Sequence, residues 1–469
     1  MAGDGKKKIG ALAGRRRRNV RILMSLVAVL IVAVAALTIV LVQKDTSTAA
    51  DGATTTSAEP SPVTATPQVA PVPDDAPMPT PAALGAVLAP LVSNPALGAF
   101  TGVVADARTG TTLWSQNPDT PMTPASTAKI LTAAAAMLSL SPDHRVETRV
   151  VQGSRPGELV LVGGGDPTLT AQPVGQPSYY PGAPRIADLV EQIRRAGAEV
   201  DSIVVDISAY AGPTMAQGWM PEDVAAGYIA PIESVMIDGA RSDPFAEEPP
   251  RSATPALDAG RVLAQALGID PARVTVGKAE SGAAPVASVL SAPLRDRLGQ
   301  MMRRSDNVLA ETIAREVAVA KNSEASFTGA TEAIGKTLYD AGFKTDGLTL
   351  HDGSGLSVDD RAPARLQADI LTAAAGETKL QLRPMLDDLP VAGATGTLSD
   401  RYASGDRTGA GWVRAKTGTL SVASALTGYV VDVDGRVLTF ALMSNDRPPE
   451  VSRPALDAVA GALRLCGCR

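Results

Sequence analysis

Short runs of apolar and β-branched residues, each bounded by turn residues, predict five β-strands in two groups. Residues 99–106 and 112–115 form the first group and are joined by a short Gly-containing turn. Residues 412–416, 425–431 and 437–443 form the second group, near the end of the chain. Strands at both ends of the folded part predict one antiparallel sheet, built from segments that are far apart in the sequence.

Apolar positions spaced three and four residues apart predict the helices that lie between these strands. The most apolar candidate spans residues 125–138, and its Ala- and Leu-rich stripe predicts a buried central helix. Residues 292–303 and 308–317 predict two more helices, separated by a short break. Candidates at residues 84–91 and 454–465 flank the whole set. We therefore predict an α/β (α+β) fold in which helices cover both faces of the antiparallel sheet.

The pattern changes between residues 141 and 290, where strand-like segments alternate with amphipathic helices. The predicted strands are residues 146–151, 159–162 and 200–206, and the predicted helices are residues 184–196 and 261–267. We interpret residues 141–290 as one or more domains inserted into a domain formed by residues 81–140 and 291–469. Trp219 and Tyr228 are expected to pack where the two regions meet.

Charge is distributed unevenly along the 469 residues. Residues 1–44 contain nine Lys/Arg and one acidic residue, which leaves 34 basic and 48 acidic residues in the remainder. Residues 22–42 have no charge and are long enough to cross a bilayer as a helix. The positive-inside rule then places residues 1–21, a basic tail, in the cytoplasm, and the acidic remainder outside the cell membrane. A cleaved signal peptide, cut near Ala49, is the alternative.

Composition excludes several other classes of protein. Residues 43–80 are rich in Thr, Ala, Pro and Ser, which is typical of an extended linker. A net charge of −6 and an aromatic content of 3% give no indication of a nucleic-acid partner. With only two histidines and two cysteines, the chain cannot build a His/Cys-rich zinc site, and we expect no metal or cofactor.

For Cys466 and Cys468, a strained disulfide, pairing between chains and free thiols all remain open.

The predicted central helix opens with a serine three residues before a lysine, Ser126 and Lys129. Pro124 and Ala125 suit a helix entry, which puts Ser126 in the first turn. Residues three apart share one face of a helix, so the lysine amine can reach the serine hydroxyl. Burial or a second cation can lower the pKa of a lysine enough for it to accept the serine proton. The S-x-x-K pattern alone is weak evidence, because a surface serine beside a solvated lysine has the same spacing.

Two further motifs follow: S-D-N at residues 305–307, in a break between predicted helices, and K-T-G at residues 416–418, on a predicted strand. In this order and these contexts, the three motifs resemble those of the low-molecular-mass class C penicillin-binding proteins, the D-alanyl-D-alanine carboxypeptidase/endopeptidase family. The 175 residues between Lys129 and Ser305 fit that family, in which extra domains lie between these motifs. Further matching stretches are residues 165–169, 352–357 and 396–398, and the resemblance covers residues 82–465.

The resemblance implies a role for each polar residue of the motifs. Ser126 is the nucleophile, Lys129 is the base, and the charge of Lys416 helps to lower the pKa of Lys129. Ser305 relays a proton between the two lysines and the leaving nitrogen. Asn307 holds Lys129 or the substrate carbonyl.

The substrate-binding residues implied by the resemblance are Thr417, Gly418 and Thr419, which lie on the K-T-G strand. The backbone N–H groups of Ser126 and Thr419 form the oxyanion hole. The Thr417 and Thr419 hydroxyls bind a carboxylate at the end of the substrate. Asp306 is expected to cap a helix rather than to take part in the chemistry.

The resemblance implies a transpeptidase-like domain that acts as a serine-type D-Ala-D-Ala carboxypeptidase on peptidoglycan stem peptides, with β-lactams as covalent inhibitors. D,D-endopeptidase activity on cross-links uses the same chemistry. A β-lactamase, or a non-catalytic wall-binding protein on the same fold, are the alternatives. A Ser-His-Asp hydrolase would use His144 or His351 as its base, but the chain has no G-x-S-x-G elbow around Ser354.

Overall fold

The computed structural model describes residues 75–467. The predicted basic tail and membrane span, and most of the predicted linker, lie outside the described residues. Within residues 75–467, no helix is both long and apolar enough to cross a membrane.

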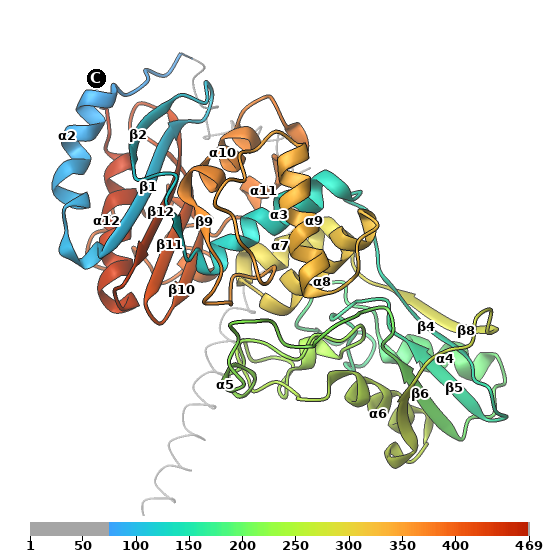
Figure 1. The fold of residues 1–469 in the computed structure, drawn as a ribbon. Helices are drawn as coiled ribbons and strands as arrows, with labels where there is room; N and C mark the ends of the chain where they lie inside the picture. Colours follow the sequence, from blue (N-terminus) through green and yellow to red (C-terminus); the bar gives the residue numbers. More distant parts are fainter. Residues whose placement is uncertain (1–74, 468–469) are drawn as a thin grey trace, which may run out of the picture. The chain divides into compact units, whose positions relative to one another are not determined.

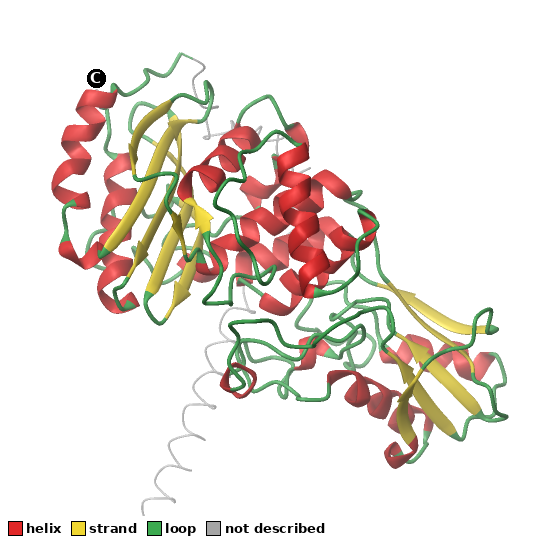
Figure 2. Cartoon of the chain, viewed as in Figure 1, coloured by secondary structure: helices red, strands yellow, loops and turns green. Residues whose placement is uncertain are grey.

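Five antiparallel strands form the main sheet, and they come from both ends of the described chain, as predicted (Figures 1 and 2). In spatial order they are β10 (Arg414–Leu420), β11 (Ala423–Val431), β12 (Val437–Asn445), β1 (Ala99–Asp106) and β2 (Thr112–Gln116). The strand predicted at residues 412–416 lies further along the chain in the structure. A turn with Gly411 at a φ of 77° precedes β10, which therefore starts later and continues through Thr419.

Helices cover both faces of the main sheet, as the apolar pattern predicts. On one face, α2 (Pro81–Val92) and α12 (Pro449–Arg464) share a core with Val104 of β1. On the other face, α10 (Ala364–Ala375) packs against Val103. Successive side chains of a strand point to opposite faces, so β1 is buried on both sides.

The helical layer is built around α3 (Lys129–Ser139), the predicted central helix. It packs with α7 (Leu294–Arg304), α8 (Asn307–Ala320) and α9 (Phe327–Asp340) in one apolar core. All residues of α3 from 129 to 136 are buried, so the helix is enclosed on all sides rather than along one stripe.

The start of this helix differs from the prediction. Residues Ala125–Ala128 form a 3₁₀ turn, η2, and α3 begins only at Lys129. Ala125 has a φ of 46°, so the chain enters the turn from a left-handed conformation. Side chains three residues apart eclipse each other in a 3₁₀ helix, which stacks Ser126 directly above Lys129.

A second five-stranded sheet is formed by strands between residues 147 and 290 (Figure 2). Its strands, in spatial order, are β7 (Val274–Gly277), β6 (Ser202–Asp206), β5 (Glu158–Val162), β4 (Glu147–Gln152) and β8 (Pro285–Leu290). β5, β6 and β7 run parallel, whereas β4 is antiparallel to both of its neighbours. The helices α4 (Ile186–Arg195) and α6 (Pro255–Leu267) share the core of this sheet. The insertion boundaries at residues 141 and 290 stay a prediction.

Two of the predicted helices begin earlier than expected. α6 starts at Pro255 rather than near residue 261, and α12 starts at Pro449 rather than Pro454. Pro suits the first helical position, which Pro449 takes in α12, and the helix continues through Pro454 in its second turn. Cys466, just after α12, is buried and disulfide-bonded, and Cys468 lies outside the described residues.

The remaining elements are short. They are β3 (Pro121–Met122), its antiparallel partner β9 (Ala362–Pro363), α5 (Glu222–Ala225), α11 (Pro384–Asp387), and the 3₁₀ turns η1 (Pro95–Leu97), η3 (Asp238–Ala240), η4 (Pro271–Arg273), η5 (Leu380–Leu382) and η6 (Gly396–Leu398).

Candidate active site

Ser126 and Lys129 lie where the start of α3 meets the main sheet. Lys129 Nζ is 3.0 Å from Ser126 Oγ, 2.6 Å from Asn307 Oδ1 and 2.7 Å from the Ser354 carbonyl oxygen. The Lys129 side chain is fully buried. The structure therefore brings together the serine, the lysine and the asparagine that the three motifs single out, and adds a carbonyl group from residue 354.

These three contacts suit a neutral amine. The Asn307 side-chain oxygen and the Ser354 carbonyl can only accept hydrogen bonds, so they take two N–H groups of the amine. The Ser126 hydroxyl can also donate. When Lys129 is neutral, its lone pair is left facing the Ser126 proton.

Burial is the main influence on the pKa of Lys129. It lowers this pKa from the usual 10.5 to about 8, although the negative charges of Asp352 and Glu311 oppose the shift. The resemblance implies a contribution from the charge of Lys416, but burial is the first cause of the shift. Lys129 can thus lose its proton near neutral pH.

Lys416 lies on β10 and contacts the S-D-N motif. Its Nζ is 2.8 Å from Ser305 Oγ and 2.7 Å from the Thr417 carbonyl oxygen, and its side chain is fully buried. Burial lowers the pKa of Lys416 well below its usual value, and the charge of Lys129 lowers it further. Ser305, with a φ of 58°, ends α7 in a left-handed conformation that turns the chain toward α8. The second and third motifs therefore meet in the structure.

β10 is the edge strand of the main sheet, and one side of its backbone faces the site. The Ala415 N–H donates to the Pro390 carbonyl, on the side away from β11. N–H groups alternate between the two sides of an antiparallel strand, so those of Thr417 and Thr419 face the same way as Ala415. The open edge thus offers the Thr419 N–H to a ligand beside Ser126.

Two glycines let the backbone approach the Ser126 turn closely. A Cβ at Gly418 would collide with the Pro124 carbonyl, and one at Gly355 would collide with the Ala125 carbonyl. Gly355 also has a φ of 78°, which side chains rarely tolerate. The turn is therefore held between β10 and the loop that follows residue 352.

Asp306 is a helix cap, as predicted, and also binds residues of the predicted insertion, 141–290, which we call the inserted region. Its carboxylate accepts from the Leu309 N–H at 2.9 Å, which caps α8. It also accepts from the Tyr180 hydroxyl at 2.8 Å and from Arg241 Nη2 at 3.1 Å. Burial raises the pKa of Asp306, but the cations Arg241 and Arg251 outweigh it and hold the pKa at about 2. The charged, buried pair of Asp306 and Arg241 thus fixes the turn that holds Ser305.

A second contact of the inserted region reaches the loop that holds Lys129. Trp219 Nε1 donates to Asp352 Oδ2 at 2.7 Å, and the indole packs edge-on against Phe327. Asp352 also accepts from the backbone N–H groups of Gly355 and Ser357, at 2.6 and 2.7 Å. The predicted packing of Trp219 at the junction is present. The prediction for Tyr228 was wrong, because its side chain is exposed; its carbonyl oxygen accepts from Asn307 Nδ2 at 3.0 Å.

Sequence reasoning missed these supporting residues. Residues 352–357 matched the family pattern, but no role was assigned to them. Arg241 and Tyr180 carry no local signal, because an isolated arginine or tyrosine in a long insertion matches no motif. The two histidines contact other groups: His144 Nε2 lies 3.2 Å from Glu316 Oε2, and the backbone N–H of His351 donates to Asp360 Oδ1.

A model of the D-Ala-D-Ala carboxypeptidase 3 (S13) family matches residues 84–249 and 245–464. The chain belongs to this family. A carboxypeptidase of Mycobacterium tuberculosis is 52% identical over 413 residues, which cover 87% of this chain and 89% of the relative. Carboxypeptidase DacB of Mycolicibacterium smegmatis is 49% identical over 458 residues, which cover 97% of this chain and 98% of the relative.

The fold of this S13 carboxypeptidase agrees with a solved relative. The crystal structure of penicillin binding protein 4 from Haemophilus influenzae superimposes with a TM-score of 0.65 and 21% identity, over 81% of this chain and 98% of that chain. The predicted fold class is therefore confirmed, as is the resemblance to penicillin-binding carboxypeptidases. The protein is a D-Ala-D-Ala carboxypeptidase, a hydrolase.

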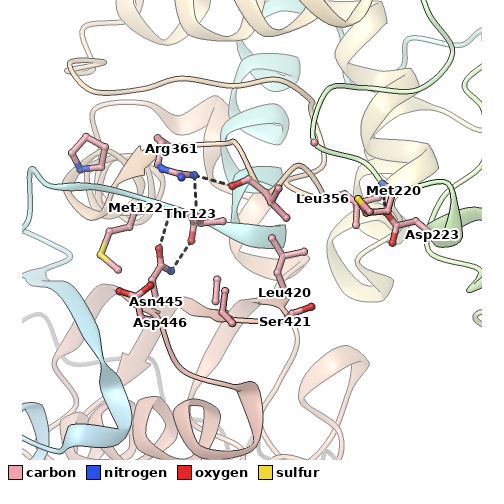
Figure 3. A pocket seen from close by; sticks show the side chains of 15 residues that line it. Met122, Thr123, Met220, Asp223, Leu356, Arg361, Leu420, Ser421, Asn445 and Asp446 are labelled. Atoms are coloured by element: carbon pink, nitrogen blue, oxygen red, sulfur yellow. Dashed lines mark hydrogen bonds between the residues drawn. The ribbon is translucent and has the colours of Figure 1, made fainter.

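A pocket of about 360 Å³ adjoins the site of the carboxypeptidase (Figure 3). Its lining includes Leu420, next to Thr419 in the chain, and Leu356, next to Gly355. Asp223 and Met220 of the inserted region lie across from Arg361, which donates to the Thr123 hydroxyl at 2.9 Å. The pocket has both apolar and charged side chains.

Proposed function

We propose that the carboxypeptidase cleaves the bond between the last two D-alanines of peptidoglycan stem peptides through an ester on Ser126. The observation that supports this most strongly is the contact between Lys129 Nζ and Ser126 Oγ at 3.0 Å, because the amine is buried and its other two contacts are acceptors. Neutral Lys129 takes the proton of Ser126 as the serine oxygen attacks the carbonyl carbon.

The attack creates a tetrahedral oxyanion that needs hydrogen-bond donors. We assign the N–H groups of Ser126 and Thr419 to this role, since both belong to segments that meet at Gly418. When the intermediate collapses, the C–N bond breaks and the leaving D-alanine nitrogen takes a proton. Ser305, hydrogen-bonded to Lys416, delivers this proton and receives in its place the one that Lys129 took from Ser126, so Lys129 is neutral again. A water molecule then attacks the ester, with Lys129 again as the base, which releases the shortened peptide.

Substrate binding is assigned to the edge of β10. The peptide lies along residues 417–419, with its terminal carboxylate near the hydroxyls of Thr417 and Thr419. Gly418 lets the strand come close to the serine turn. The pocket lined by Leu420 and Leu356 then takes the part of the stem peptide on the acyl side of the cleaved bond.

β-Lactams are expected to acylate the same serine, because they present a reactive amide and a carboxylate. Penicillin binding protein 4 of Haemophilus influenzae has been solved as a complex with a novel β-lactam, at 20% identity and a TM-score of 0.62 to this chain. A stable acyl-enzyme separates this proposal from a β-lactamase, which would release hydrolysed penicillin with turnover.

The proposed substrate places the enzyme in the bacterial cell envelope. We infer that residues 22–42 anchor it in the cell membrane, with residues 43–80 as the tether and the catalytic part outside.

The proposed function is tested with a pentapeptide muropeptide and a cross-linked dimer, each incubated with the enzyme and analysed by mass spectrometry. Loss of one alanine from the pentapeptide is the expected result, and an enzyme that leaves it intact would contradict the proposal. Conversion of the dimer to monomers would add D,D-endopeptidase activity, since this bond also follows a D-alanine.

A further inference from the structure

The hydroxyl of Thr419 has a partner from a distant part of the chain. Arg453, in the second turn of α12, donates through Nε to Thr419 Oγ1 at 3.1 Å. Arg453 belongs to none of the three motifs and is separated from Thr419 by two strands in sequence. Among residues 75–467, no other cationic side chain from outside the motifs forms a hydrogen bond with Thr417 or Thr419.

The position of Arg453 is fixed through its neighbour. Ser452 is fully buried, and its hydroxyl donates to Ser424 Oγ at 2.8 Å. Ser424 is the residue of β11 that pairs with Thr419 of β10. α12 is thus fastened to the sheet at the level of Thr419, and Arg453 reaches this strand position rather than another.

The hydrogen bond determines which way the Thr419 proton can point. A guanidinium group only donates, so Thr419 Oγ1 accepts from Arg453 and keeps its own proton for another acceptor. The Thr417 hydroxyl differs, because it donates to Thr397 Oγ1 at 2.7 Å. Of the two threonine hydroxyls on β10, Thr419 is the one that remains available as a donor.

The rest of the Arg453 guanidinium is also available. The side chain is exposed, and Nε is its only nitrogen with a hydrogen-bond partner in the described part of the chain. No carboxylate among these residues forms an ion pair with it. Its two terminal nitrogens can therefore bind an anion beside Thr419, and a planar guanidinium matches a carboxylate well.

We propose that Arg453 is a specificity-determining residue that recognises the free C-terminal carboxylate of the substrate. Its terminal nitrogens pair with the carboxylate, while its Nε holds the Thr419 hydroxyl as a second donor. The inference rests on the proposed function, because it takes the carboxylate of the leaving D-alanine as the ligand. It predicts a preference for peptides with a free terminal acid over the same peptides ending in a carboxamide.

The test compares a D-Ala-D-Ala peptide with its C-terminal carboxamide as substrates of the full-length enzyme. In Arg453→Gln, kcat/KM for the acid should fall about 10- to 100-fold, mainly through a higher KM, because a charge-assisted hydrogen bond is lost. The value for the carboxamide should change little, so the preference for the acid shrinks. Arg453→Lys should retain part of it, and Arg447→Gln, an exposed arginine that donates to Pro95, should retain all of it.

An equal loss on both substrates would overturn the inference, since it would indicate a structural role. Unchanged kinetics of Arg453→Gln would overturn it as well. Prolonged penicillin labelling counts the active enzyme in each preparation, so misfolded variant is excluded from the rates. Failure of the proposed function looks different: the unmodified enzyme would then release no D-alanine and take up no penicillin on Ser126.

Discussion

Lys129 is a basic residue placed where its charged form is disfavoured. It is fully buried, and every group within hydrogen-bond distance of its amine is uncharged. The carboxylates of Asp352 and Glu311 act on it through space and oppose the effect of burial. The result is a pKa near about 8, within reach of physiological pH, which a solvated lysine would not have.

The first prediction concerns the pH dependence of D-alanine release. Only the neutral amine can accept a proton, so kcat/KM should rise with pH and level off above the Lys129 pKa of about 8. Each pH unit below that value should lower the rate about tenfold. The measurement is kcat/KM for a D-Ala-D-Ala peptide from about pH 6 to 10. A flat profile between about pH 6 and 9 would argue against Lys129 as the base.

A second prediction concerns Glu311, whose carboxylate accepts from the Gly353 N–H at 3.0 Å. Burial and the neighbouring Asp352 raise the pKa of Glu311 to about 7, so it is charged where Lys129 titrates. A negative charge favours protonated Lys129, so Glu311→Gln should lower the pKa of Lys129. The acid limb of the kcat/KM profile should move to lower pH. The control is Glu332→Gln, at an exposed site on α9, which should leave the acid limb in place. An acid limb that does not move in Glu311→Gln would show that Glu311 and Lys129 are not coupled.

At the scale of elements, the turn between α7 and α8 connects the inserted region with the site. Ser305 ends α7, Asp306 caps α8, and Asn307 is the first residue of α8. Arg241 and Tyr180 hold Asp306 from the inserted region, with Arg241 also donating to the Tyr180 hydroxyl at 2.7 Å. Fixing one carboxylate thus positions two functional side chains.

The third prediction tests this connection with Tyr180→Phe. Loss of the hydroxyl removes one donor from Asp306 and one acceptor from Arg241, which should cost about 1–3 kcal/mol of unfolding free energy. A shifted turn should lower kcat about tenfold with KM little changed, since we assign Ser305 to the chemical step. Urea unfolding and steady-state kinetics measure both effects. The control is Tyr339→Phe, on the exposed face of α9. Lost stability with unchanged kcat in Tyr180→Phe would show that the contacts of Tyr180 with Asp306 and Arg241 have only a structural role.

The elements show what the sequence could predict. Strands and helices with clear apolar patterns, such as β1 and α3, were found within a few residues. The 3₁₀ turn before Lys129 was missed, because its geometry depends on Gly418 and Gly355 from other segments. The three motifs indicated side chains that the structure brings into contact, Ser126 with Lys129 and Asn307, and Ser305 with Lys416. The contacts of Asp306, Asp352 and Thr419 with distant residues could not be predicted, since each is made only when the fold is complete.

At the scale of the whole molecule, every functional residue discussed belongs to the compact unit Pro71–Arg469. The region between the first and second motifs supports the site, because Trp219 and Arg241 contact the two loops that hold Lys129 and Ser305. The basic residues concentrated before position 45 fit the membrane anchor that we propose.

The fourth prediction separates catalysis from the proposed membrane anchor. A fragment of residues 71–469 should keep the kcat and KM of the full chain, because it contains the whole site. The full chain should sediment with membranes, whereas the fragment should stay in the supernatant. Cell fractionation with activity measurements in each fraction checks this. A full chain found in the supernatant would contradict the proposed anchor, and an inactive but folded fragment would show that the first 70 residues contribute to the site.

The central claim is that Ser126, activated by Lys129, forms the acyl-enzyme. Its most direct test is the intact mass of the protein after incubation with benzylpenicillin, followed by peptide mapping. The enzyme should gain the mass of one benzylpenicillin, since the β-lactam ring opens without losing an atom, and the adduct should map to Ser126. Ser126→Ala should gain no mass and release no D-alanine, whereas Ser115→Ala, at an exposed site on β2, should be labelled in full. A stable adduct on Ser126→Ala, or one that maps to another residue, would contradict the account.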